Sequence, residues 1–155
     1  MPRILFTDSR VRPLMVTVDD AVGPNCPNKR PDVLLVQFLL KVGDESPANS
    51  SWWKVKRGTG VRIDGVFGEH TQSLIRQVQE QAHPGDNRLA HDSRVDPIAQ
   101  GNYYGARTGV LMTMVVLNMI YMQGTGSNDI TTMPYHFWWP KELSPSLQIA
   151  VSHAA

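Results

Sequence analysis

The chain has 155 residues, of which 41% are hydrophobic and 19% are charged, a composition that excludes a chain disordered throughout its length. Its formal net charge of +1 is too small to indicate nucleic acid or an anionic membrane as the default partner. The single cysteine, Cys26, excludes both an intrachain disulfide and a cysteine-rich zinc site.

Residues 1–30 predict an N-terminal arm. The opening sequence MPRILFTDSRVRPLMVTVDD contains no apolar run of the length found in secretory signal peptides. Within it, residues 14–18 (LMVTV) are rich in β-branched side chains, which favours one short strand. Residues 23–31 (GPNCPNKRP) contain three prolines and two asparagines, a composition typical of a loop. We therefore expect the helical part of the chain to begin after this loop.

Three segments have apolar residues at helical spacing and predict α-helices. The first, residues 32–43, follows Pro31 and ends at Gly43, which suit a helix start and a C-terminal cap. The second covers residues 69–82. The third, residues 110–122, is apolar on nearly all sides, so we expect it to be the most buried. It is shorter than the roughly 20 residues that span a bilayer. The residues expected to be buried in the common core are Val36, Leu40, Phe67, Ile75, Val78, Met114 and Leu117.

Residues 124–155 predict a C-terminal arm that is unusually aromatic. Its run YHFWWP, residues 135–140, lies among prolines at 134, 140 and 145, which disfavour a long helix. Left exposed, such an apolar cluster is a liability, so it must cover the chain's own core or a partner. Both alternatives stay open. The candidate partner-binding residues are Tyr135, Phe137, Trp138 and Trp139.

Two stretches, VLLVQFLLKVG at residues 33–43 and IDGVFGEHTQSLIRQVQ at residues 63–79, carry a recognisable motif. Through them, residues 31–81 resemble the peptidoglycan-binding-like domain, a small non-catalytic helical module. That family has a helix of the type Val-x-x-Leu/Val-Gln-x-x-Leu-x-x-x-Gly and then a turn of the type Asp-Gly-x-Phe-Gly-x-x-Thr. The matching positions are Val33, Val36, Gln37, Leu40, Gly43, Asp64, Gly65, Phe67, Gly68, Thr71, Leu74, Ile75, Val78 and Gln79. Val78 stands where the family usually has phenylalanine.

The resemblance implies a mainly α fold, a small three-helix peptidoglycan-binding-like bundle with non-helical N- and C-terminal arms. The bundle would cover residues 31–123 with insertions, flanked by arms at residues 1–30 and 124–155. The family's third helix follows a second Asp-Gly turn, for which residues 94–97 (RVDP) are the candidate remnant. Turn and packing roles explain the motif residues fully, so the resemblance implies a fold and only loosely a ligand. We expect Gln37 and Gln79 to bond loop backbone.

A second aromatic cluster lies between the first two helices. Trp52, Trp53 and Lys54 are followed by two further cations, Lys56 and Arg57. Flat rings stack on sugars or bases, and cations bind carboxylates or phosphates. Alternatively, one tryptophan caps the bundle and the cations are solvated, since tryptophan is usually substantially buried. The candidate ligand-binding residues are Trp52, Trp53, Lys54, Asp64 and Phe67.

No complete catalytic or metal site is recognisable. His83 and His91 flank Asp86, but the spacing found in zinc D-Ala-D-Ala-type peptidases is missing. Cys26 has no local signature of a nucleophile, and the paired carboxylates lie in polar, loop-like segments. We therefore expect a protein without enzymatic activity, metal or cofactor.

Three function classes follow from these features. We expect a structural or assembly subunit of a larger particle, such as a phage virion or a contractile injection machine. The alternative is a free cell-wall glycan-binding protein or the targeting subunit of a wall hydrolase; a small hydrolase is the third and least favoured class. The missing export signal favours the first class, because peptidoglycan lies outside the cytoplasm. The expected partners are other protein subunits, with peptidoglycan as a further candidate, and neither nucleic acid nor a membrane span. We expect cytoplasmic synthesis, while the final location, including incorporation into a virion or secreted particle, stays open.

Overall fold

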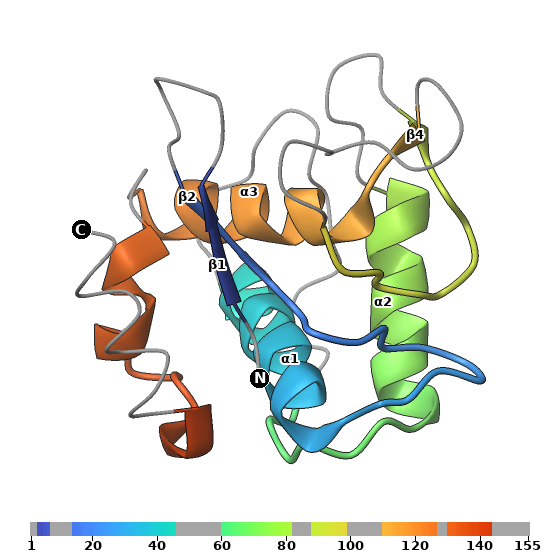
Figure 1. The fold of residues 1–155 in the computed structure, drawn as a ribbon, viewed down its shortest axis with the longest axis horizontal. Coiled ribbons are helices and arrows are strands. Elements are labelled where there is room, and N and C mark those ends of the chain that lie inside the picture. The colour runs from blue at the N-terminus through green and yellow to red at the C-terminus, as the bar shows by residue number, and fades with distance from the viewer. Residues whose placement is uncertain are drawn as a thin grey trace.

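The chain is mainly α-helical, as predicted. The helices are α1 (Arg30–Glu45), α2 (Glu69–Gln81) and α3 (Thr113–Thr125). Together they form a three-helix bundle flanked by an N-terminal hairpin and a C-terminal arm (Figure 1). The computed structural model describes residues 3–6, 14–45, 60–81, 88–98, 110–126 and 130–143.

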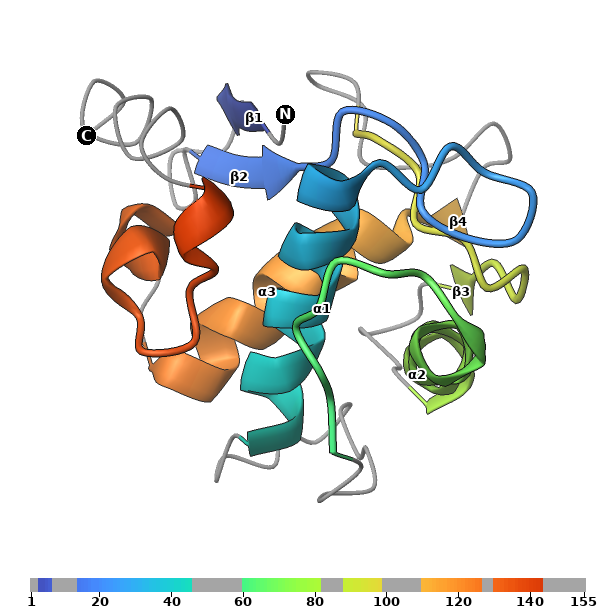
Figure 2. The same ribbon diagram turned by 90° about the horizontal axis from the view of Figure 1, so that it is seen from below.

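The central helix is α1. It lies between α2 on one side and the C-terminal arm on the other, and α3 crosses it (Figure 2). Its apolar residues surround the helix, and Val33, Leu35, Val36, Phe38 and Leu39 are all fully buried. A helix that is apolar on every side is stable only inside the core. The sequence predicted α3 to be the most buried helix, but α1 occupies the centre.

The start of α1 is tied to the N-terminal arm by a buried carboxylate. Asp32 is fully buried, and its two oxygens accept hydrogen bonds from the backbone N–H groups of Asp19 (2.8 Å) and Asp20 (3.1 Å). Buried polar oxygens need such hydrogen-bond partners. The Asp32 carboxylate therefore fixes where the loop enters the helix.

The N-terminal arm forms a hairpin that packs on α3. Strand β1 (Arg3–Phe6) pairs antiparallel with β2 (Leu14–Thr17), so the predicted strand at residues 14–18 is confirmed. Asn118 of α3 is fully buried, and its side-chain amide bonds both the N–H (2.9 Å) and the C=O (2.8 Å) of Val16. The amide thus takes the place of a neighbouring strand. This contact spans 102 residues of sequence.

The third helix begins later than predicted because a short parallel pair precedes it. Strands β3 (Arg88–Leu89) and β4 (Val110–Leu111) pair in register, which leaves α3 to begin at Thr113. The C-terminal arm contains no α-helix within residues 130–143; it forms two 3₁₀ helices, η1 (Ile130–Tyr135) and η2 (Lys141–Leu143). Among the described residues, no helix has the length and apolarity that crossing a membrane requires.

Six of the seven residues predicted for the core are buried, and Phe67 is the exception. Val36, Leu40, Ile75, Val78, Met114 and Leu117 are each exposed by 6% or less. Phe67 is only half-buried and packs against the edge of the core. The prediction for Phe67 was wrong because hydrogen bonds to a buried glutamine, and not an apolar anchor, hold its turn.

Candidate functional site

The turn that follows residues 60–63 is organised by one buried amide. Gln37 of α1 is 1% exposed. Its Oε1 accepts the backbone N–H groups of Asp64 (3.1 Å) and Gly65 (2.8 Å). Its Nε2 donates to Asp64 Oδ1 (2.9 Å), Val66 O (3.1 Å) and Thr71 Oγ1 (3.1 Å). Helix α1, the turn and the first residues of α2 are thereby joined at one side chain.

The same arrangement recurs between α2 and α3. Gln79 of α2 is 2% exposed, and its Oε1 accepts the backbone N–H of Ser93 at 2.8 Å. Its Nε2 donates to Asp92 Oδ1 (3.0 Å), Arg94 O (3.1 Å) and Thr113 Oγ1 (3.0 Å). The second turn is therefore residues 92–94, and the predicted remnant at residues 94–97 was misplaced.

These two networks are copies of one helix-turn-helix unit. In each, the aspartate Oδ1 accepts the backbone N–H two residues later, at 3.0 Å. The middle residue of each turn, Gly65 (φ 74°) or Ser93 (φ 58°), has left-handed backbone. The glutamine and threonine of each copy are 34 residues apart. This shared separation is the sequence signal that was missed. Gln37 and Gln79 bond loop backbone as predicted.

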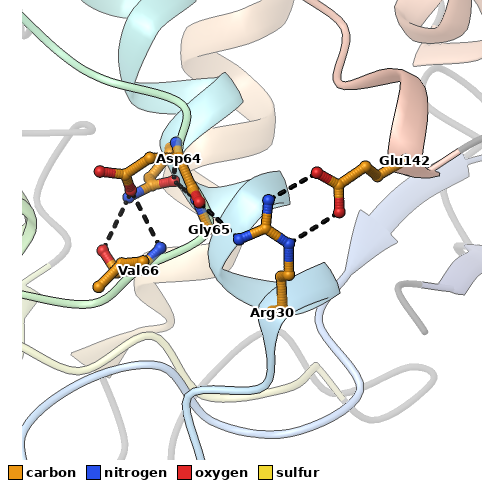
Figure 3. A network of polar contacts seen from close by, with 6 residues as sticks. Arg30, Asp64, Gly65, Val66 and Glu142 are labelled. Atoms are coloured by element: carbon orange, nitrogen blue, oxygen red, sulfur yellow. Dashed lines mark hydrogen bonds and ion pairs between the residues drawn. The ribbon is translucent and has the colours of Figure 1, made fainter.

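Arg30, at the start of α1, joins the first turn to the C-terminal arm. Its Nη1 donates to Asp64 O at 2.7 Å, while Nε and Nη2 donate to the two carboxylate oxygens of Glu142 at 2.8 and 2.6 Å (Figure 3). The hydrogen bond from Arg30 lowers the pKa of Glu142. Both side chains are about half exposed, so the pair contributes orientation more than stability.

Two hollows flank residues 60–64. The first, of about 480 Å³, is lined mainly by polar side chains of the turn and of α2, and we refer to it as the polar pocket. The second, of about 580 Å³, lies between this segment, α1 and the C-terminal arm, and we refer to it as the aromatic groove. Side chains at the mouth and floor of the aromatic groove include Lys41, Val61, Ile63, Phe137, Trp138 and Lys141.

Of the predicted ligand-binding residues, the structure describes Asp64 and Phe67. Asp64 lines the polar pocket, but its Oδ1 is used inside the turn. The backbone N–H of Val66 and then the Gln37 amide lower the pKa of the Asp64 carboxyl, which favours the ionised form that accepts these hydrogen bonds. Phe67 packs against the core. The remaining candidates, Trp52, Trp53 and Lys54, lie outside the described residues.

The predicted partner-binding residues divide into two groups. Trp139 is 7% exposed, and its ring meets Phe38 edge-on at 5.1 Å, so it belongs to the chain's own core. Trp138 is half-buried and meets the ring of Phe137 at 4.8 Å. Tyr135 and Phe137 are 80% and 86% exposed. Only the last two present a whole ring to the surroundings.

His136 is a structural residue of the arm. Its Nδ1 accepts the backbone N–H of Trp138 at 3.1 Å, and its ring meets Phe38 at 5.5 Å and Tyr121 at 6.1 Å. Burial lowers the pKa of this imidazole, which favours the neutral form that the acceptor role needs. Within the described part of the chain, no group of three His, Cys, Asp or Glu side chains could hold a metal ion.

Arg30, Lys41, Lys141 and Glu142 were not predicted as site residues. The last two follow the aromatic run directly in the sequence, and that adjacency was an available signal. Arg30 gave none, because its partner Glu142 is 112 residues away. Comparison of the chain with protein-family models, with curated proteins and with solved structures finds no match.

Gly65 provides a test of the contact between the turn and Arg30. A Cβ at this position would lie 2.7 Å from Arg30 Nη1 and 2.9 Å from Arg30 Cγ. Gly65→Ala should therefore lose more unfolding free energy than the roughly 1–2 kcal/mol cost of left-handed backbone alone. Gly60→Ala is the matched control, because Gly60 also has positive φ (+70°) but a Cβ there would meet no atom within 4 Å. Chemical denaturation of both variants measures the difference, and equal losses would show that Arg30 moves away freely.

Proposed function

We propose that the chain is a non-catalytic peptidoglycan-binding-like module that serves as an assembly subunit and docks on another protein subunit through its C-terminal arm. One observation carries the proposal: the arm is anchored in the chain's own core, yet it exposes two large rings. Met133, Trp139 and Leu143 are buried at 2%, 7% and 0% exposure, whereas Tyr135 and Phe137 are exposed. Aromatic rings fixed in this way are characteristic of protein interfaces.

The assignment to this kind of module is supported by the residues that form the first turn. Gln37, Asp64, Gly65 and Thr71 are motif positions of the resemblance, and they meet in one hydrogen-bonded network. The network explains why each residue type is needed: an amide that both donates and accepts, a carboxylate, a residue tolerant of positive φ, and a hydroxyl. None of these roles requires a bound ligand, which suits a scaffold.

A wall glycan is the second candidate ligand, and the aromatic groove is the observation that favours it. Phe137 and Trp138 form an edge-to-face pair at 4.8 Å, and Lys141 lies beside them. Sugars pack their apolar faces on such rings, and a cation can bind a sugar carboxylate. Both candidates depend on the Phe137 ring, so one experiment has to test them in parallel.

The test is to replace the exposed rings in the full chain. We expect the wild-type protein to co-sediment with a larger native complex in extracts of its source cells, and the Tyr135→Ala, Phe137→Ala double variant to sediment as a free chain. Its stability should change by no more than about 0.5 kcal/mol per site, as is usual for surface substitutions. Val66→Ala is the control, because Val66 is also an exposed apolar residue, at 62%.

Each outcome separates the two candidates. Equal co-sedimentation of the wild type and the double variant would overturn the assembly role. Binding to purified peptidoglycan sacculi that is lost in the double variant, without any larger complex, would establish the glycan-binding alternative instead.

A further inference from the structure

The aromatic groove has an apolar floor made by segments from both halves of the chain. Val61 is 5% exposed, Pro140 is buried, and Ile63 and Trp138 are half-buried. Phe137 stands at the edge with 86% of its surface exposed. The groove therefore offers apolar surface at its base and a whole aromatic ring at its side. A side chain that entered it would leave water on several sides.

The groove is preformed, because both of its sides are anchored independently of any occupant. On the arm side, Trp139 packs edge-on against Phe38 at 5.1 Å, and the fully buried Leu143 follows. On the other side, hydrogen bonds with Gln37 and Arg30 hold the turn at Asp64 and Gly65, which directly follows the groove residues Val61 and Ile63. A preformed groove binds without the entropic cost of ordering its walls.

Of the charged side chains that line the groove, the one that is free to pair with an occupant is positively charged. Both oxygens of Glu142 are engaged by Arg30, so this carboxylate is already compensated. Lys41 pairs with Glu45 at 3.1 Å and lies 4.6 Å above the Trp138 ring. Lys141 is exposed, and it forms no ion pair with any residue that the structure describes. One uncompensated ammonium group thus borders the apolar floor.

From this arrangement we infer that the aromatic groove receives an acidic peptide segment of the partner subunit. An apolar side chain of the segment packs between Ile63, Phe137 and Trp138, and a neighbouring Asp or Glu carboxylate pairs with Lys141. The inference rests on the proposed function and names the chemistry of the partner at the same site.

A peptide fits this groove better than a sugar does. A saccharide brings many hydroxyl groups, and each needs a hydrogen-bond partner when it is removed from water. The Glu142 oxygens are already used by Arg30, and the Lys41 ammonium is shared between Glu45 and a ring. The side chains of Val61, Ile63 and Pro140 offer carbon surface only. An aliphatic or aromatic side chain with one adjacent carboxylate makes no such demand.

The test uses the full chain and fluorescence anisotropy with a labelled peptide in which leucine and phenylalanine alternate with aspartate. We expect saturable binding that weakens as salt is raised and is lost when the aspartates are replaced by asparagines. Lys141→Glu should weaken binding by about tenfold or more, because it places a like charge opposite the peptide. The charge-matched control is Arg76→Glu on α2, which lies across α1 from the arm (Figure 2) and should bind like the wild type.

The inference would be overturned by no binding of the acidic peptide, by equal binding of its asparagine counterpart, or by equal weakening from Lys141→Glu and Arg76→Glu. Preferential binding of an acidic polysaccharide over the peptide would overturn it as well. The proposed function is tested by a different experiment, the co-sedimentation of the chain with a larger native complex and its loss when Phe137 is replaced. If that sedimentation persists while the acidic peptide does not bind, the arm docks on a partner of different chemistry.

Discussion

Replacing Gln79 with leucine is expected to lower the free energy of unfolding by about 3 kcal/mol. Leucine has a similar size but can neither donate nor accept. The backbone N–H of Ser93, in a residue 4% exposed, loses its acceptor, and the Thr113 hydroxyl and Arg94 carbonyl lose a donor. A buried polar group left unpaired costs about 1–3 kcal/mol. Urea denaturation followed by circular dichroism measures the loss.

The control lies two residues away on the same helix. Gln77 is half-buried, and Gln77→Leu should change stability by about 0.5 kcal/mol or less. If the two networks are copies of one unit, Gln37→Leu should cost as much as Gln79→Leu, because Gly65 loses its acceptor in the same way. A loss for Gln79→Leu no larger than that for Gln77→Leu would show that the second network does not hold the fold.

The helices were predictable because their apolar residues recur at helical spacing, and each was found within a few residues of its predicted bounds. The second turn was not predictable in the same way. Its middle residue is Ser93, which adopts positive φ where a glycine was expected. The Asp-Pro pair at residues 96–97 drew the prediction away from it. The identity of the turn is visible only from Gln79, whose side chain bonds both Ser93 of the turn and Thr113 of α3.

The aromatic run shows where sequence periodicity gives no guidance. Neighbouring Phe137, Trp138 and Trp139 are exposed, half-buried and buried in turn. The run lies between two short 3₁₀ helices, η1 and η2, so no constant angle per residue assigns its faces. The composition of the run predicted that it covers the chain's own core or a partner, and Trp139 does cover the core. That the exposed rings contact a partner stays a prediction. The aromatic groove was missed because its floor comes from segments far apart in the sequence.

Replacing Trp139 with alanine is expected to have the largest effect among the aromatic residues of the arm. Its ring is 7% exposed and packs edge-on against Phe38 at 5.1 Å. Loss of a buried tryptophan costs about 3–5 kcal/mol, through lost burial and the cavity left behind. The cavity would open beside Phe38, which also contacts His136. Chemical denaturation gives the loss, and limited proteolysis in the native state reports release of the arm.

The adjacent tryptophan supplies the comparison. Trp138 is half-buried, and its ring contacts Lys41. Trp138→Ala therefore removes the same type of side chain as Trp139→Ala, but from a position that is only half-buried. It should cost about 1–2 kcal/mol in proportion to the smaller buried area, and the arm should stay resistant to protease. Because Trp139 anchors the arm that displays Phe137, Trp139→Ala should also abolish binding to a partner, whereas Trp138→Ala should weaken it without freeing the arm. If Trp138→Ala lost as much stability as Trp139→Ala or more, Trp138 and not the buried Trp139 would anchor the arm that carries Tyr135 and Phe137.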